Sequence, residues 1–456
     1  MKFKSKFFLF FLILLFILFV LGVIRIEKKI LFLNQKTQQF GKSINELNSR
    51  IAVLIKREEF LTTGLELSES ETSDIKSKSN IYNIKTFNLP FLRGKEWIGI
   101  PAAYLEQTDN EIIFASSSGE FFSFKKKDIG FDNLDLKKIR SNIKNVIKNE
   151  EFYSDGFVTI KDLLILNNKI FFSYIKKLTN NCYNTSIMSS EFNLNYLKFT
   201  EFFSYEDCIV GAHGALWNSG GRMIPFKDGK ILLSTGVMTQ MLLAQNTNSM
   251  FGKIISIDLK TKEFEMVSMG HRNPQGLFYD QNLNIIINTE HGPTGGDEIN
   301  INFNPDNETI ENYGWPISTY GKHTEFELKT STERYENKLM KDISTHKSHK
   351  DFGFIEPIKY FVPSIAISEI IKIPKTFNEK FMNDFFIGAL GYKGQIDQGD
   401  QSIHHIRFND NFDKIIFEDV IPIGERIRDI IFVKEKNILL LVLESIPAIG
   451  VLKLAN

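Results

Sequence analysis

From Ile81 to the C-terminus, short apolar runs recur and are separated by Asn, Asp and Gly. Many follow one scheme, in which an apolar run, a short polar turn and a second apolar run succeed one another, as in DLLILNNKIFFSYI and GKIISIDLKTKEFEMV. Runs of this length between turn residues are typical of strands. Their number predicts an all-β sandwich, barrel or propeller, and their irregular spacing indicates a degenerate repeat.

Length and charge narrow the class further. The chain has 456 residues, with 55 basic and 55 acidic side chains, so its formal charge is zero. A neutral chain offers no electrostatic grip on nucleic acid, and we expect no nucleic-acid partner. The length is compatible with a single large β domain.

The N-terminus differs from the rest of the chain. An unbroken apolar run from Phe7 to Ile24 is just long enough to span a bilayer, and no small-residue cleavage site follows it. We therefore expect residues 1–29 to be an uncleaved signal anchor, with the following domain on the periplasmic or extracytoplasmic side of the membrane. Basic residues flank the run at Lys2, Lys4, Lys6, Arg25, Lys28 and Lys29.

Residues 30–67 predict a helical stalk, because apolar residues recur at spacings of three, four or seven. This stripe could form a coiled coil with a second copy, giving a homo-oligomer, or it could pack on the domain. The polar segment 68–80 predicts a linker, and residues 81–456 predict the β domain. The stripe consists of Leu33, Phe40, Ile44, Leu47, Ile51, Leu54, Leu61 and Leu65.

Two segments are predicted to be inserted into the β domain. Residues 135–150 have helical spacing of their apolar residues, and residues 323–351 are charged and predict a surface loop. The only two cysteines are Cys182 and Cys208. Outside the cytoplasm, where disulfides persist, we expect a disulfide rather than two free thiols. The histidine pairs at 346/349 and 404/405 are more typical of loop or strand residues than of a metal site.

The stretch from Gly270 to Pro316 predicts a turn, a strand hairpin, a glycine-rich bend and a second turn. Arg272 and Asn273 precede a proline, which favours extended backbone and displays the pair on a bend. Gly292, Gly295 and Gly296 allow a tight bend whose backbone could face a ligand or cation. The acidic pair Asp297-Glu298 follows, and carboxylates suit calcium.

The order of these motifs closely resembles the glucose/sorbosone dehydrogenase family, the soluble pyrroloquinoline quinone (PQQ)-dependent aldose dehydrogenases. The matching motifs are G-x-R-N-P-Q-G at 270–276, E-x-G-P with an acidic pair at 290–298, and N-Y-G-W-P at 312–316. Three linked motifs in the same order are far more specific than one glycine pattern. The resemblance covers roughly residues 211–454 and implies a six-bladed β-propeller.

The resemblance also implies cofactors and residue roles. PQQ would lie in the central funnel with a calcium ion, and arginine forks would hold its carboxylates. Arg272 and Asn273 match the quinone-side pair, and Arg426 and Arg428 match the R-x-R-D turn. The carbonyls of Gly292 and Pro293 match the donors to the cofactor's calcium, whereas Glu298 and Tyr313 match a structural calcium site.

The sequence departs from the family at the catalytic base. Asn218 occupies the slot of the family's histidine, and an amide cannot act as a base at neutral pH. His213 lies five residues upstream, and Asp155 replaces part of a missing glutamine turn. We therefore consider His213 and Asp155 as substitute bases. The lysine expected after the G-x-L strand falls at Gly391, with Lys393 two residues on.

Three readings follow from the sequence. The first is a membrane-anchored, PQQ-dependent aldose sugar dehydrogenase that oxidises a sugar at its anomeric carbon with altered acid–base groups, including Arg272 beside the quinone. The second is a non-catalytic propeller that binds a sugar or a quinone-like acid. The third is a propeller that binds a protein partner, with its arginines in structural ion pairs. We favour the first as the description of the family, and its catalytic competence is an open question.

Overall fold

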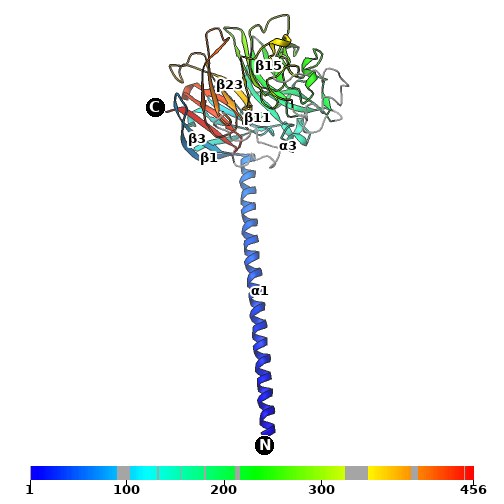
Figure 1. Ribbon diagram of the computed structural model, residues 1–456, viewed down its shortest axis with the longest axis vertical. Coiled ribbons are helices and arrows are strands. Elements are labelled where there is room, and N and C mark those ends of the chain that lie inside the picture. Colours follow the sequence, from blue (N-terminus) through cyan, green and yellow to red (C-terminus); the bar gives the residue numbers. More distant parts are fainter. Residues whose placement is uncertain are drawn as a thin grey trace. The chain divides into compact units, whose positions relative to one another are not determined.

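The computed structural model describes residues 2–89, 103–130, 133–154, 156–178, 181–210, 216–227, 229–323, 348–391, 399–445 and 447–455. The chain forms two compact units, residues 1–62 and 63–456. The first unit is a single helix, α1, which runs from Lys2 to Thr62 (Figure 1). The second consists mostly of strands.

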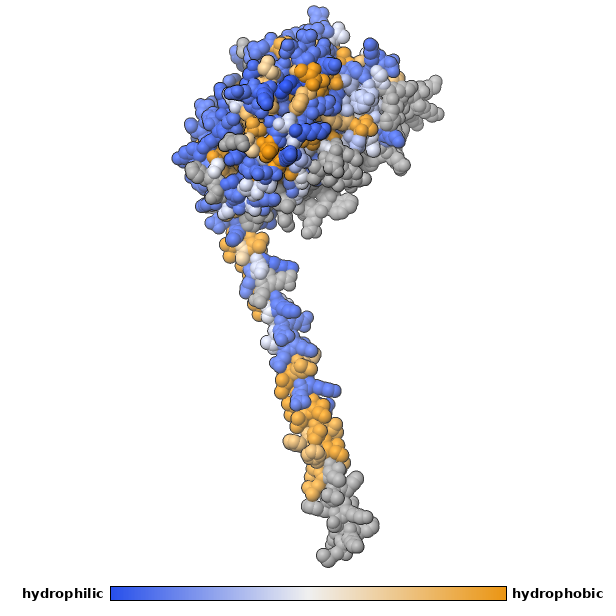
Figure 2. All heavy atoms as spheres, turned by 60° about the vertical axis from the view of Figure 1, so that its left-hand side comes forward, coloured by the Kyte–Doolittle hydropathy of each residue, from blue (hydrophilic) through white to orange (hydrophobic). Residues whose placement is uncertain are grey.

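Exposed apolar side chains follow α1 from Phe11 to Leu33, where Figure 2 shows them around the helix. Within the described residues, no helix has an apolar stretch long enough to cross a membrane. The side chains of residues 7–10 and 13, which belong to the predicted anchor, lie outside the described residues. Further along the helix, the heptad residues Phe40, Ile44 and Leu47 are exposed too.

The second unit consists of six mostly antiparallel sheets, the blades of a propeller, as the resemblance implied. The main strands of the first three blades follow one another along the chain from β4 onwards, and β1, β11 and β21 join these blades from elsewhere in the sequence. Blade 1 contains β1 (Gly64–Ser68), β4 (Ala103–Gln107), β5 (Glu111–Ser116), β6 (Phe121–Lys125), β7 (Asn133–Ser141) and β11 (Tyr196–Leu197). Blade 2 contains β8 (Ile160–Leu166), β9 (Lys169–Lys177), β10 (Cys182–Glu191), β12 (Thr200–Phe203) and β13 (Ile209–Val210). Blade 3 contains β14 (Gly220–Phe226), β15 (Lys230–Thr235), β16 (Lys253–Asp258), β17 (Phe264–Met269) and β21 (Glu311–Asn312).

The other three blades include the C-terminal strands of the unit. Blade 4 contains β18 (Pro274–Asp280), β19 (Ile285–Glu290), β20 (Asp297–Asn302) and β22 (Lys359–Phe361). Blade 5 contains β23 (Ile367–Ile373), β24 (Asp384–Ala389), β25 (Ile403–Phe408) and β26 (Ile415–Ile421). Blade 6 contains β2 (Glu71–Lys76), β3 (Ile81–Asn88), β27 (Ile427–Val433), β28 (Ile438–Leu443) and β29 (Ala448–Leu454).

The innermost strands of the blades form a closed ring. Strand β4 contacts β8, and the contacts continue through β14, β18, β23 and β27 back to β4. Blade 6 closes the ring by joining an early strand to the last described one, because β3 pairs with β29 from Asn88↔Ala448 to Tyr82↔Leu454. In Figure 1 the C-terminal strands, in red, lie beside β3. Closure leaves few free sheet edges, which is how propellers avoid exposed edge strands.

Apolar side chains between the blades account for the runs seen in the sequence. Strand β28 reads ILLLVL and is buried along its whole length, since it lies inside blade 6 between neighbouring blades. The largest cluster joins blades 1, 2 and 3 and is rich in phenylalanine, with Phe172 and Phe199 packed edge to face at 4.7 Å. Continuous rather than alternating apolar runs are typical of strands that are covered on both faces.

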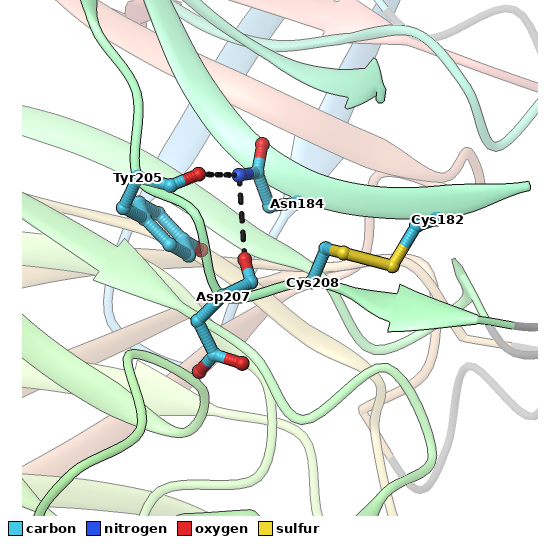
Figure 3. The surroundings of a disulfide bond; sticks show 5 residues. All are labelled: Cys182, Asn184, Tyr205, Asp207 and Cys208. Atoms are coloured by element: carbon cyan, nitrogen blue, oxygen red, sulfur yellow. Dashed lines mark hydrogen bonds between the residues drawn. A yellow bond between two sulfur atoms is a disulfide. The ribbon is translucent and has the colours of Figure 1, made fainter. Parts of the chain in front are cut away.

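The structure confirms the predicted disulfide between Cys182 and Cys208, whose Cα atoms lie 5.5 Å apart (Figure 3). The bond joins β10 to the start of β13. The amide of Asn184 donates to the backbone carbonyls of Tyr205 (2.6 Å) and Asp207 (3.4 Å) and holds the same loop.

Two local predictions are wrong. The predicted linker 68–80 carries β2, which pairs with β3, and β1 before it pairs with β7. Their polar character reflects solvent-exposed strands rather than a flexible segment. The predicted helix at 135–150 is mostly strand β7, and only Ile143–Val146 is helical, as α2. Most of the predicted loop 323–351 lies outside the described residues.

The remaining helical segments are single turns. They are α3 (Glu151–Ser154), η1 (Lys126–Asp128), η3 (Met241–Gln245), η4 (Lys350–Phe352) and η6 (Lys434–Lys436).

Candidate functional site

The turn that leads into β18 places Arg272 and Asn273 at one end of the ring of inner strands. The Arg272 backbone N–H donates to Glu290 (2.8 Å), and its guanidinium donates to the His291 carbonyl (3.1 Å). The same guanidinium lies 5.4 Å from the centre of the Trp315 ring, a cation–π contact. The backbone and the side chain of Arg272 are therefore both held in place, and the residue is only 8% exposed.

Gln275 connects this turn to blade 6. Its amide nitrogen donates to Asn273 Oδ1 (2.9 Å), and its amide oxygen accepts from Arg428 Nη1 (3.0 Å). Asn273 Oδ1 also accepts from the backbone N–H of Gly220 (3.1 Å), one of the residues after Asn218. The amide of Gln275 thus joins blades 3, 4 and 6 at the same end of the propeller.

Glu444 lies between the two arginines of the R-x-R-D turn. Arg428 donates to both of its oxygens, at 2.6 and 3.4 Å, and Arg426 Nη2 donates at 3.3 Å. Arg426 Nη1 donates to the Gly391 carbonyl. A single buried carboxylate therefore serves two guanidinium groups, and Arg426 Nε is buried without a partner among the described residues.

His291 marks where the arginines converge. Burial lowers the pKa of its imidazole to about 3, and the nearby guanidinium groups of Arg272, Arg428 and Arg426 act in the same direction. The ring is therefore neutral at physiological pH, and its Nε2 is buried without a partner among the described residues. Arg272 and Arg428 consequently lie in one polar region around His291.

The glycine-rich bend is closed by protein contacts. A Cβ on Gly292 would lie 2.1 Å from the Gly296 carbonyl oxygen, so only glycine fits there. Asp297 accepts from the Gly292 N–H (3.0 Å), the Ser364 hydroxyl and two further backbone N–H groups. Its carboxylate is satisfied by protein donors, which leaves the carbonyls of Gly292 and Pro293 as the predicted calcium ligands of the bend.

Beside the bend, two buried carboxylates are each paired with a histidine. Glu290 Oε1 lies 3.0 Å from His271 Nδ1, and Glu298 Oε1 lies 3.1 Å from His349 Nε2. The amide of Asn300 donates to both carboxylates, at 2.9 and 3.3 Å. The predicted calcium ligand Tyr313 stacks on His271 at 4.8 Å, and its hydroxyl donates to Glu311 (3.1 Å). Within the described ranges, no three His, Cys, Asp or Glu residues are grouped to hold a metal ion.

Asn218, in the slot of the family's base, is buried at 7% exposure, and its carbonyl accepts from the Met238 N–H (2.7 Å). The candidate bases His213 and Asp155 lie outside the described residues, as does Lys393. Trp217, directly before Asn218, is 58% exposed and its ring lies 5.7 Å from that of Phe157.

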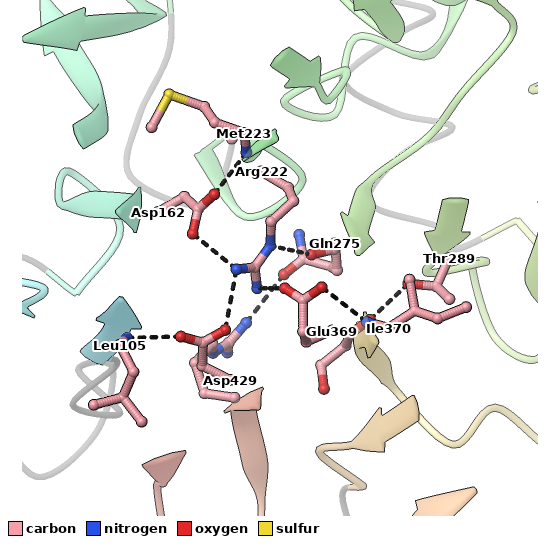
Figure 4. Close-up of polar contacts among 12 residues, drawn as sticks. Leu105, Asp162, Arg222, Met223, Gln275, Thr289, Glu369, Ile370 and Asp429 are labelled. Atoms are coloured by element: carbon pink, nitrogen blue, oxygen red, sulfur yellow. Dashed lines mark hydrogen bonds and ion pairs between the residues drawn. The ribbon is translucent and has the colours of Figure 1, made fainter. Parts of the chain in front are cut away.

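Arg222 lies on the axis of the ring, one layer below this polar region (Figure 4). Its guanidinium donates to Asp162 (2.8 Å) and Asp429 (3.1 Å), pairs with Glu369 (2.6 Å) and donates to the Gln275 carbonyl (3.0 Å). It also lies 5.7 Å from the Tyr104 ring. One side chain from blade 3 therefore contacts all five other blades.

Too few cations surround the carboxylates of this layer. Burial raises the pKa of Asp162 to about 7 and that of Glu369 well above its usual value, although Arg222 opposes both shifts. Burial also raises the pKa of Glu106 to about 8. Below these residues a cavity of about 350 Å³ is lined by the inner strands of all six blades. The sequence predicted roles for neither this layer nor Glu444 and His291.

Comparisons with known proteins agree with this architecture. The family described as Glucose / Sorbosone dehydrogenase matches residues 158–446. An uncharacterized protein, slr1608, of Synechocystis sp. is 32% identical over 201 residues, which is 41% of this chain and 42% of that protein. The aldose sugar dehydrogenase YliI of Escherichia coli is 27% identical over 191 residues, or 39% and 46% of the two chains. The chain thus matches less than half the length of these curated relatives.

Solved structures share the fold. The apo-form of the soluble aldose sugar dehydrogenase from Escherichia coli has a TM-score of 0.58 at 20% identity and covers 82% of this chain and 99% of its own. The PQQ-bound aldose sugar dehydrogenase from Streptomyces coelicolor has a TM-score of 0.52 at 13% identity, with coverage of 85% and 100%. Motifs, blade count and the family match over most of the propeller agree. The chain therefore belongs to the glucose/sorbosone dehydrogenase family.

Proposed function

We propose that this protein is a PQQ-binding aldose sugar dehydrogenase that oxidises a sugar at its anomeric carbon. One observation carries the proposal: Arg272 donates to the His291 carbonyl, Arg428 of blade 6 bonds Gln275 in the turn that carries Arg272, and the guanidinium groups of both arginines act on the pKa of His291. Structural arginines on separate outer surfaces would not lie around one histidine. A convergent cationic region suits an acidic ligand.

The residues present fit PQQ, a tricarboxylate. Arg426 and Arg428 share one carboxylate, Glu444, so this pair of guanidinium groups keeps an excess of positive charge. Buried polar atoms without a partner among the described residues include Arg426 Nε and Trp315 Nε1, which can donate, and His291 Nε2, which can accept. Unpaired buried donors are costly, and an acidic ligand would satisfy them.

Each residue of the site would then have a defined task. Arg426 and Arg428 would bind carboxylates, and Arg272 and Asn273 would orient the quinone side of the ligand. PQQ, when bound, would accept the hydride from the sugar. The carbonyls of Gly292 and Pro293 are the oxygen donors that would hold calcium beside it.

The proton acceptor is the unassigned part of the reaction. Asn218 cannot take a proton from the sugar hydroxyl. This same observation favours a second candidate function, in which the propeller binds a quinone-like acid or a sugar without turnover. His213 and Asp155 are the proposed substitute bases for the catalytic reading.

Calorimetry on the full chain separates these functions. We expect heat on titration with PQQ in the presence of calcium and little heat without it. No heat under either condition would remove both PQQ-binding readings. Dye reduction scanned across aldoses then tests turnover, and PQQ binding without dye reduction would support the non-catalytic function.

A base is tested separately with His213→Ala and Asp155→Asn. If His213 is the base, His213→Ala should abolish dye reduction while the calorimetric PQQ signal persists. Unchanged dye reduction in both variants would place the base elsewhere.

We also propose that the apolar run Phe7 to Ile24 anchors the protein in a membrane, with the propeller outside the cytoplasm. The Cys182–Cys208 disulfide supports this side, because disulfides persist in oxidising compartments. Membrane fractionation of the full chain and of a chain beginning at residue 30 tests the anchor. Recovery of both in the soluble fraction would contradict it.

The exposed heptad residues of α1 support self-association of the stalk. Sedimentation of chains with and without residues 33–65 should give an oligomer only when the stripe is present. Monomers in both samples would refute the coiled coil.

A further inference from the structure

The contacts of Glu298 differ from those of a metal ligand. Its Oε1 lies 3.1 Å from His349 Nε2, and its Oε2 accepts from the amide of Asn300. Both oxygens therefore already face protein groups. Calcium takes six to eight oxygen ligands, and no three His, Cys, Asp or Glu residues of the described chain are grouped around Glu298 to hold a metal ion.

His349 is held in this position by more than its carboxylate partner. Its ring stacks on Tyr320 with an interplanar angle of 13°, and Tyr320 stacks on Tyr360 with ring centres 3.7 Å apart. Tyr360 is the cross-strand neighbour of Glu298 in blade 4. The stack therefore ends on β22, which pairs with β20, the strand that carries the carboxylate.

The backbone fixes His349 as well. Its carbonyl accepts from the N–H groups of Phe352 (3.0 Å) and Phe354 (3.1 Å) at the turn η4. Glu356 accepts from the Lys350 N–H (2.8 Å) and the Ser348 hydroxyl (2.9 Å), so residues on both sides of the histidine are tied down. The imidazole is 1% exposed.

The space beside Glu298 is nearly filled. The remaining void, lined by Glu290, Glu298, His349 and Tyr313 among others, has a volume of about 10 Å³. This is the lower limit for a single water molecule. Removal of the imidazole would enlarge the void and leave Oε1 of Glu298 without its histidine partner.

We infer that the His349 imidazole takes the place of the structural calcium ion, so that the wall behind Arg272 is held together by protein groups alone. In this wall Glu298 connects through Asn300 to Glu290, and Glu290 accepts from the Arg272 backbone N–H. His349 is therefore a positioning residue for the arginine turn. A calcium ion at the carbonyls of Gly292 and Pro293 is a separate site that the inference leaves unchanged.

The test measures thermal unfolding of the full chain without PQQ, in EDTA and in calcium, so that it is independent of the proposed enzymatic function. The wild-type protein and Glu298→Gln should show the same calcium effect on the unfolding midpoint. His349→Ala should unfold several degrees lower in EDTA and should gain a calcium-dependent rise. The double variant His349→Ala/Glu298→Gln should lose that rise, because the calcium would bind at the vacated carboxylate.

His404→Ala is the matched control. His404 is a buried histidine of blade 5 whose Nε2 faces the Gly399 carbonyl (2.9 Å) instead of a carboxylate. Its replacement should lower the midpoint without creating a calcium effect. His349→Gln keeps most of the side-chain volume and replaces the alanine variant if the latter does not fold.

A calcium-dependent rise in the wild-type midpoint that Glu298→Gln abolishes would overturn the inference, because it would place a metal ion at Glu298. A His349→Ala or His349→Gln variant that shows no more calcium dependence than the wild-type protein would overturn it too.

Discussion

At the scale of residues, the site depends on a few buried charges that share partners. Arg428 touches both Gln275 and Glu444, so it connects the turn before β18 of blade 4 with the residue that follows β28 in blade 6. The buried carboxyl groups of Glu106 and Asp162, near Arg222, have raised pKa values. These two features lead to two predictions.

Arg428→Leu should weaken PQQ binding by at least tenfold, because a charge-assisted hydrogen bond contributes about 1.5–3 kcal/mol. Calorimetric titration in calcium measures the loss. Arg407→Leu is the control, since Arg407 Nε donates to Asp384 in blade 5 (2.8 Å) and contacts none of the site residues named above. Equal affinity of Arg428→Leu and wild type would contradict the assignment of Arg428 as a ligand.

Glu106 should make the protein less stable as the pH rises from about 5 to 8. Burial raises its pKa from 4.5 to about 8, so the folded state binds a proton in this range that the unfolded state has released. Stability from this group is therefore complete at low pH and is lost as the pH rises through this window. Glu106→Gln, which has no proton to lose, should flatten the profile.

Thermal midpoints between pH 5 and pH 8 measure this effect. We expect the variant to gain up to about 5 kcal/mol over wild type at pH 8, since a rise from 4.5 to about 8 corresponds to about 1.4 kcal/mol per pKa unit. Asp162, whose pKa is raised to about 7, should leave part of the slope in the Glu106→Gln variant. Identical slopes for the variant and wild type would show that Glu106 titrates normally.

At the scale of elements, the inner strands are joined by a side chain rather than by backbone pairing. Arg222 in β14 reaches β4, β8, β18, β23 and β27 through its guanidinium. The disulfide performs a similar task at the edge of blade 2, where it ties β10 to the chain that leads toward Asn218.

Arg222→Met should destabilise the propeller by about 3–5 kcal/mol, because it removes the cation from a buried group of carboxylates. Lys230→Met is the control, since Lys230 pairs with Glu265 on an exposed surface (2.9 Å) and should cost about 1 kcal/mol or less. Chemical unfolding of both variants compares the two costs. Similar losses would show that the Arg222 contacts stabilise no more than a surface pair.

Replacement of both Cys182 and Cys208 by serine should lower stability by about 2–4 kcal/mol. The same loss should appear in the wild-type protein after reduction with a thiol, which would have no further effect on the double variant. Unfolding curves with and without reductant make this comparison. A wild-type protein insensitive to complete reduction would contradict a stabilising role.

At the scale of the whole molecule, sequence patterns predicted the class of fold and the position of the arginine site. Both depend on local signals, namely strand-length apolar runs and turn motifs that keep their order. The boundary of the domain was predicted wrongly, because β1 and β2 carry polar, solvent-facing residues that look like a linker until their partners are known. Polar strands of this kind owe their structure to distant pairing.

The site was predicted in part for the same reason. Arg272, Asn273, Arg426 and Arg428 belong to motifs and could be named from the sequence. Glu444 ends an ordinary apolar strand, LVLE, and His291 fills the variable position of E-x-G-P. Their roles become visible only when separate blades come together in the fold. The acidic Glu444 at the end of an apolar strand was the one sequence signal that pointed to a buried charge.

A chain that begins at Thr63 should fold into the complete propeller, whereas one that begins at Ile81 should be markedly less stable. The shorter chain lacks β1, β2 and the Ser79 contacts to Asp419, which tie this segment to blade 5. Thermal unfolding of the two purified chains tests the boundary. Equal midpoints would show that these strands add nothing to the closed ring.

The pairing in blade 6 also has a consequence for folding during synthesis of the protein. Its β3 is among the first strands of the propeller to be made, and its partner β29 is the last of the described strands. The early strand must therefore wait, with one edge unpaired, until β29 has been synthesised and has left the ribosome. During this interval the nascent propeller is an open ring, and the unpaired edge of β3 is the part that a chaperone would most need to shield from aggregation.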